Sequence, residues 1–250
     1  MPDALLQVWS MPGLLWLILT ICIGGIVRGF TGFGTALIFV PVAGIFLPPA
    51  VVIGVITLTG IASTAALLPR AWGQANRPEV GLLALVALLT VPLGLWLLDH
   101  LPNQAIRWLV AGIATVTLIA LVAGWRFSGY VSKPRLGGIG AVAGAIGGLT
   151  GLTGPVVILF YLAGRATAQS VRANTILFLA ALDVVIVVNL LLRQAVTLNT
   201  AFLAAILAVP YFFTTLIGQS MFDPRHERLY RWAAYGVIAA AVLTGLPIWT

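Results

Sequence analysis

The stretch Gly29-Phe30-Thr31-Gly32-Phe33-Gly34 lies inside a long hydrophobic segment, and it returns in edited form as Gly148-Leu149-Thr150-Gly151-Leu152-Thr153-Gly154. A glycine in a helix interior costs roughly 1 kcal/mol relative to alanine. Three glycines in each copy therefore predict that a helix breaks here, twice, in the most apolar part of the chain.

The composition is that of a chain embedded in lipid. Of the 250 residues, 61% are hydrophobic and 8% are charged, whereas soluble domains carry roughly 25% charged residues. Because so few charges cannot cover a water-facing surface, we expect an all-α polytopic membrane protein. The single cysteine, Cys22, excludes an internal disulfide, and two isolated histidines indicate no metal or haem centre, so no cofactor is expected.

Polar or proline-rich junctions divide the apolar sequence into blocks, most of which match the roughly 20 residues that a helix needs to cross a bilayer. The blocks cover about 12–47, 50–68, 79–98, 105–124, 136–163, 174–192, 201–220 and 231–249. The two blocks that contain the glycine stretches are too long for one straight span. No basic residue precedes Arg28, so a secretory signal is not indicated and the first block is expected to be retained.

The two halves of the chain are related by an internal repeat. A shift of 119 residues places Gly29 on Gly148, and a shift of 124 places the Arg107-Trp108 pair on Arg231-Trp232. The repeat predicts three regions, which are a first repeat over 1–125, a cytoplasmic linker over 126–135 and a second repeat over 136–250.

The distribution of Lys and Arg predicts how the halves are oriented. If each glycine-rich block crossed the membrane once, the basic residues between segments would divide six against six. If each block returns to the face it entered, ten lie on one face and only Arg107 and Arg193 on the other. This bias matches the positive-inside rule. It predicts an inverted repeat with both termini extracytoplasmic. Each half then has a glycine-broken first segment, either re-entrant or discontinuous, plus three transmembrane helices. The net charge of +7 is then a topology signal, and nucleic acid is not an expected partner.

Broken helices in inverted repeats are typical of transporters, whose substrate sites lie near the midplane at the repeat interface. A half-helix that begins after each break would direct unpaired N–H groups and the positive end of its dipole inward, where a small anion could bind. The candidate substrate-binding residues are Arg28, Gly29, Thr31, Gly32, Gly34, Thr35, Gly148, Thr150, Gly151, Thr153 and Gly154. The alternative interpretation of the glycines is close helix packing.

Two ionisable residues, Arg28 and Asp183, lie deep in apolar sequence. Charges at such depth are costly and usually face a cavity or a partner. Arg28 is a candidate for neutralising a bound anion, and structural pairing is the alternative. Asp183 is a candidate partner of Arg28 or a proton-coupling group, and a structural hydrogen bond is the alternative. Asn189, Gln219 and Ser63 are weaker candidates for lining the path.

The glycine-rich openings of the two halves also carry a family resemblance. The first reads Gly24-Gly25-Ile26-Val27-Arg28-Gly29-Phe30-Thr31-Gly32-Phe33-Gly34, followed by Pro41, and the second runs from Gly144 to Gly154, followed directly by Pro155. With the length and the four-plus-four blocks, these features resemble the sulfite exporter TauE/SafE family of membrane permeases. The resemblance implies a bacterial inner-membrane transporter that exports sulfite or small organosulfur anions such as sulfoacetate, driven by ion gradients. Family members typically have a denser glycine run than Gly32-Phe33-Gly34, a departure that bears on the substrate.

A secondary transporter is therefore the leading hypothesis, with a small anion, the bilayer and a coupling proton as partners and a homodimer as a compatible state. A passive anion channel could share this sequence, and the dependence of flux on proton gradient or potential would separate the two. A membrane-embedded enzyme would need clustered His, Glu or Asp, which the chain lacks. No P-loop motif for ATP is present.

Overall fold

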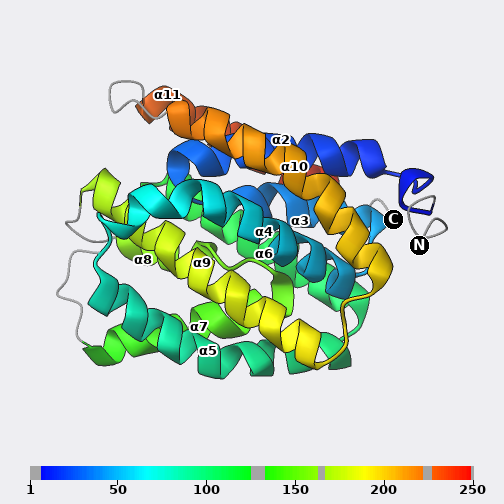
Figure 1. Cartoon of the computed structure of the whole chain (residues 1–250), viewed down its shortest axis with the longest axis horizontal. Helices are drawn as coiled ribbons and strands as arrows, with labels where there is room; N and C mark the ends of the chain where they lie inside the picture. Colours follow the sequence, from blue (N-terminus) through cyan, green and yellow to red (C-terminus); the bar gives the residue numbers. More distant parts are fainter. Residues whose placement is uncertain (1–6, 125–132, 163–166, 222–226, 249–250) are drawn as a thin grey trace.

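The computed structural model describes residues 7–124, 133–162, 167–221 and 227–248, and the regular structure within these ranges is entirely helical (Figure 1). The helices are α2 (Leu14–Thr31), α3 (Thr35–Phe46), α4 (Pro49–Trp72), α5 (Arg77–His100), α6 (Asn103–Val122), α7 (Lys133–Thr150), α8 (Pro155–Leu162), α9 (Ala168–Leu192), α10 (Leu198–Ser220) and α11 (Glu227–Gly245). The predicted all-α fold is confirmed.

Six of the described helices are long and apolar enough to cross a membrane: α2, α4, α5, α6, α9 and α10. Large apolar side chains such as Leu89, Val116 and Leu192 are exposed on their outer faces, as lipid contact requires. The chain is therefore a multi-pass membrane protein. Helix α11 is not among the six, because its first turns are polar and carry Arg228 and Arg231.

The helices break at both glycine stretches. Helix α2 ends at Thr31 and α3 begins at Thr35, with Gly32 at φ 88° and Gly34 at φ 103° between them. The second break separates α7 from α8 and contains Gly151 at φ 73°. Glycine adopts positive φ without the steric penalty that a Cβ brings, so these local sequences form breaks where other residues would continue the helix.

After the first break, α3 folds back along α2. The Thr35 hydroxyl at the start of α3 donates to the Gly24 carbonyl at 3.0 Å. The ring of Phe46 at the end of α3 lies against Gly13, where a Cβ would overlap it. These two contacts make α2 and α3 antiparallel, so the broken segment returns toward the end of the molecule at which α2 begins.

The first helix of each half packs on a helix of the other half. Gly29 and Gly218 bring α2 against α10, and Gly148 and Gly94 bring α7 against α5. A Cβ at any of the four positions would overlap the backbone of the facing helix. Positions 29 and 148 differ by 119 and positions 94 and 218 by 124, so the two contacts correspond through the repeat. Small residues permit such close approach between helices in membranes.

Helices α2 and α7 run in opposite directions, with α2 starting at the right of Figure 1 and α7 at the left. This arrangement and the exchanged contacts support the inverted repeat, which stays a prediction. Most of the predicted linker over 126–135 lies outside the described residues, and its last part, from Lys133, is the first turn of α7.

Candidate functional site

The two breaks meet at the interface between the halves. A Cβ built on Gly154 would lie 3.8 Å from the Cβ of Phe33, so the second break touches the first. The first break packs against α9, where Gly32 faces Arg172, and the second packs against α4, where Gly151 faces Ile53. Both pairs are related by the 119-residue shift. The interface between the halves therefore contains non-helical backbone from both of them.

Thr31 and Thr150, which correspond in the repeat, use their hydroxyls to hold the breaks. The Thr31 Oγ1 is 2.7 Å from the carbonyl four residues earlier and accepts a hydrogen bond from the Phe33 N–H at 3.1 Å. The Thr150 Oγ1 does the same, with distances of 2.8 Å to the carbonyl and 3.2 Å to the Leu152 N–H. Each hydroxyl satisfies a backbone group that the break would otherwise leave without a helical partner.

Thr35 is the first residue of α3 and Thr153 lies within the second break, and both are buried. The Thr35 hydroxyl donates to Gly24 and accepts a hydrogen bond from the Tyr211 hydroxyl at 2.8 Å, which ties α3 to α10. The Thr153 methyl lies against Gly147 of α7, 3.0 Å from where a Cβ there would be. Thr35 thus has a structural role, because its hydroxyl holds the start of α3 against α2 and α10.

The remaining predicted glycines divide into two groups. Gly32, Gly34, Gly151 and Gly154 lie in the breaks themselves, while Gly29 and Gly148 lie in the helix contacts with α10 and α5. The packing interpretation accounts for the second group. The first group forms the irregular backbone that a substrate could approach.

A buried ion pair adjoins the first break. Arg28 lies in the last turn of α2, and its Nη2 is 3.8 Å from Oδ2 of Asp183 on α9, with both side chains 7% exposed. This distance is too long for a hydrogen bond, and within the described residues neither of these two atoms has another hydrogen-bond partner. Buried charges normally have their hydrogen bonds satisfied. The pair therefore keeps bonding capacity for a small polar species at the end of α2.

Gly60 of α4 makes the space that Asp183 occupies. A Cβ at position 60 would overlap the carboxylate of Asp183. Ser63, a weaker candidate for the path, donates to the Gly60 carbonyl at 3.0 Å instead. Asn189 similarly donates to the Val185 carbonyl at 2.9 Å within its own helix.

Arg172 is a second cation beside the first break, although the charge pattern counts it among the ten basic residues expected on the cytoplasmic face. Helix α9 begins at Ala168, earlier than the predicted 174, so Arg172 lies in its first turns. Its Nη2 donates to the Gly29 carbonyl at 2.5 Å, and its side chain lies against Gly32. The repeat offered no signal for this contact, because the counterpart of Arg172 is Ile53.

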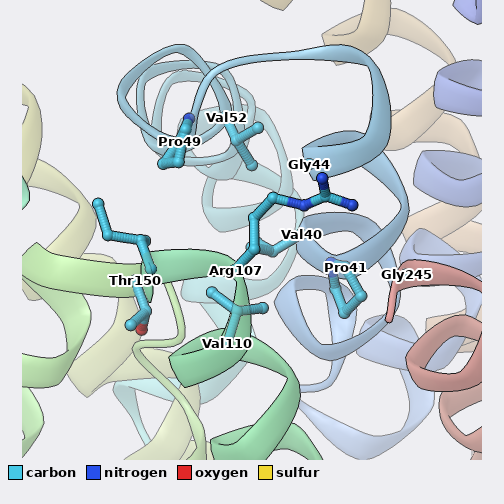
Figure 2. Close-up of a pocket in the computed structure, with 10 residues that line it drawn as sticks. Val40, Pro41, Gly44, Pro49, Val52, Arg107, Val110, Thr150 and Gly245 are labelled. Carbon is cyan, nitrogen blue, oxygen red and sulfur yellow. The ribbon is translucent and has the colours of Figure 1, made fainter. Parts of the chain in front are cut away.

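A pocket lies beside the second break, where α3 ends and α4 and α6 begin (Figure 2). Its cavity volume is about 20 Å³, which is room for about one water molecule. Its ten lining residues come from α3, α4, α6, α7 and α11, and Arg107 is the one charged residue among them. Thr150 belongs both to this lining and to the second break.

These features define a multi-pass membrane protein of transporter type, with two broken helices that meet beside buried charges. The sequence model of the family described as Sulfite exporter TauE/SafE matches residues 17–244, and the chain belongs to this family of membrane transporters for sulfite and related anions. The match spans both halves, so the resemblance is confirmed. No curated protein and no solved structure matches the chain.

Proposed function

We propose that the protein is a secondary transporter that exports a small sulfur oxyanion or organosulfur anion, such as sulfite or a sulfoacetate-like sulfonate. The anion binds between the two glycine breaks and crosses by alternating access. The observation that carries this proposal is the contact between the breaks at Phe33 and Gly154, together with the buried Arg28 in the last turn of the helix that leads into the first break.

The chemistry of the first break suits an oxyanion. Gly34, the residue before α3, provides no side-chain cap, so the first N–H groups of α3 are available to a ligand at the positive end of the helix dipole. Arg28 adds a full positive charge in a buried setting, where charge-assisted hydrogen bonds to an oxyanion are strong. Together they replace the hydrogen bonds that a small anion loses when it leaves water, and they balance its negative charge.

Asp183 links anion binding to a proton. An anion at Arg28 competes with the Asp183 carboxylate, and protonation of Asp183 removes this competitor. A proton and an anion are therefore bound together more readily than either alone, by reciprocal linkage. For a divalent anion the complex still carries one net negative charge outward, which an inside-negative potential favours by about 2.3 kcal/mol per 100 mV.

The location follows from the charge distribution and the family. We place the protein in the bacterial cytoplasmic membrane with both termini outside, since nine of the ten basic residues that the charge pattern groups on one face would then lie toward the cytoplasm, while Arg172 lies at the first break. A homodimer is compatible with this arrangement.

The test is a ligand screen followed by flux. Purified protein is melted with sulfite, sulfate, thiosulfate and short sulfonates, because a ligand at 100 times its dissociation constant stabilises by about 2.7 kcal/mol. The anion that stabilises is then followed out of proteoliposomes under imposed pH gradients and potentials. Saturable, gradient-dependent flux is expected. Rapid flux that follows the potential alone and does not saturate would indicate a passive channel, and no stabilisation by any sulfur anion would overturn the substrate class.

A further inference from the structure

We propose that Arg172 is a positioning residue for the transported anion. By donating to the Gly29 carbonyl, it holds the last turn of α2 in the orientation that presents Arg28 to an anion at the first break. This inference rests on the proposed transport function and adds a residue of α9 to the site. Arg172 acts through the backbone of α2, and the anion itself is bound by Arg28 and the first N–H groups of α3.

The first break takes away the helical partner of the Gly29 carbonyl. In an uninterrupted helix this carbonyl would accept a hydrogen bond from the N–H four residues later, at Phe33. The Phe33 N–H instead donates to the Thr31 hydroxyl at 3.1 Å. The preceding carbonyl, that of Arg28, keeps its helical bond to the Gly32 N–H at 2.8 Å. The Gly29 carbonyl is therefore the first in the last turn of α2 that needs a partner from outside the helix.

Arg172 supplies that partner from α9. Its Nη2 donates to the Gly29 carbonyl, and a guanidinium at the C-terminal end of a helix also offsets the negative end of the helix dipole. The side chain reaches this carbonyl by passing Gly32, where a Cβ would lie 2.9 Å from the Arg172 Cγ. Glycine at position 32 thus provides both the positive φ of the break and the space for the arginine.

Helix α10 holds Gly29 from a second direction. A Cβ at position 29 would overlap the Thr215 carbonyl and the Gln219 backbone nitrogen, so α10 lies directly against this residue. With α10 against its Cα and Arg172 at its carbonyl, the peptide that follows Arg28 is fixed in place. The direction of the Arg28 side chain depends on this peptide, because the two residues are consecutive in the chain.

Helix α9 contacts both Arg28 and Gly29. Arg172 and Asp183 are 11 residues apart, which is about three helical turns, so they lie on the same face of α9. Asp183 approaches the Arg28 guanidinium to 3.8 Å, while Arg172 binds the Gly29 carbonyl. One helix thereby sets both the backbone and the side chain of the arginine that binds the anion.

At the second break, the position equivalent to Arg172 is apolar. The shift of 119 residues places Gly29 on Gly148 and Ile53 on Arg172, and Gly151 of the second break faces Ile53. An isoleucine side chain cannot donate to a carbonyl or offset a helix dipole. The two breaks therefore share a backbone turn but differ in electrostatics, and the anion is expected nearer to the first break.

Anion affinity tests this role on purified full-length protein, by thermal shift with sulfite and with methanesulfonate. Arg172→Met removes the donor but keeps most of the side-chain volume, and it should weaken binding about tenfold, as the loss of one charged hydrogen-bond donor does. Arg172→Lys keeps a charged donor and should stay within about threefold of the wild type. Arg193→Met is the matched control, because Arg193 follows the last turn of α9 and binds Asp99 at the surface. It should bind both anions like the wild type.

Hydrogen exchange shows whether the effect passes through the backbone. Arg172→Met should lose exchange protection over residues 28–35 and keep it over 148–154, since only the first break loses a partner. Weaker binding with unchanged exchange would overturn the positioning role and make Arg172 a direct ligand of the anion. Wild-type affinity in Arg172→Met would overturn it as well. If Arg172→Met does not fold, Arg172→Gln takes its place, because it removes the charge and shortens the donor.

Flux separates this inference from the proposed function. In proteoliposomes, Arg172→Met should raise KM about tenfold with a smaller change in kcat, because binding is what the residue supports. Gradient-dependent flux with equal KM in the wild type and Arg172→Met would exclude the positioning role and leave transport standing. Arg172-dependent binding without flux would support the role and count against transport. No binding of either anion by the wild type would overturn both.

Discussion

Arg28 and Asp183 pair across the interface between the two halves, with Nη2 of the arginine 3.8 Å from Oδ2 of the aspartate and both side chains buried. The pair joins the last turn of α2 to α9 beside the point where the chain turns back on itself. An ion pair that is buried yet too long for a hydrogen bond is poorly compensated for its desolvation. Its position beside the breaks is more readily explained by function than by stability.

Separate and combined replacement of the pair should distinguish these roles. Arg28→Gln or Asp183→Asn alone leaves a buried charge unpaired, which typically costs about 3–5 kcal/mol, so each should lower the melting temperature. The double variant should regain much of this stability, since no charge remains uncompensated. It should still fail to bind the anion in the melting screen. Wild-type affinity in the double variant would show that Arg28 does not contact the substrate.

Anion binding should strengthen as the pH falls through the range in which Asp183 takes up a proton. The ionised carboxylate competes for Arg28 and the protonated one does not, so affinity is highest on the acid side. The measurement uses a sulfonate, whose own charge stays constant over the range. Asp183→Asn should bind equally well at every pH, whereas Asp99→Asn, which alters an exposed carboxylate paired with Arg193, should keep the wild-type profile. A flat wild-type profile would exclude Asp183 as the coupling group.

Leucine at the break glycines should abolish transport. Gly32 and Gly151 have positive φ, which costs an L-residue roughly 1–2 kcal/mol, and both face side chains of the opposite half. We expect Gly32→Leu and Gly151→Leu to reach the membrane but to show less than about a tenth of wild-type flux, since a loss of 1.4 kcal/mol is already tenfold.

Gly112→Leu is the matched control for these variants. No atom lies within 4 Å of a Cβ at Gly112 on α6, and its φ is not positive, so this variant should transport normally. Normal flux in both break variants would leave the glycines with a packing role only.

A reporter fused after Thr250 should be extracytoplasmic. The expectation follows from the nine basic residues on one face and the two on the other that remain when Arg172 is set aside, once each broken segment returns to its own side. Paired alkaline phosphatase and fluorescent-protein fusions measure it directly. A cytoplasmic C-terminus would contradict the inverted repeat.

The local features of the fold could be predicted because glycine carries its own backbone signal. The breaks at Gly32 and Gly151 depend on positive φ, which neighbouring residues cannot supply. The partner of each helix could not be predicted in the same way. Gly29 has the spacing of a packing residue, but in a chain this apolar no polarity difference indicates that α10, rather than α5, covers it.

Unlike Arg28, the arginines Arg172 and Arg107 could not be placed from the sequence, for a different reason. Arg172 follows a polar junction, and a shift of a few residues in the start of α9 moves it from a loop to the first break. Arg107 precedes a tryptophan at a helix start, a pattern typical of an interfacial anchor, so its position in a pocket becomes visible only with α3 and α11 in place.

The exchange of helices between the halves has a consequence for synthesis of the chain. About 190 residues separate Gly29 from Gly218, its contact on α10, and at roughly 5–20 residues per second the ribosome needs about 10–40 s to add them. During that interval α2 sits in the bilayer with its glycine face against lipid or the insertion machinery. The first half therefore lacks this helix contact until α10 has been synthesised.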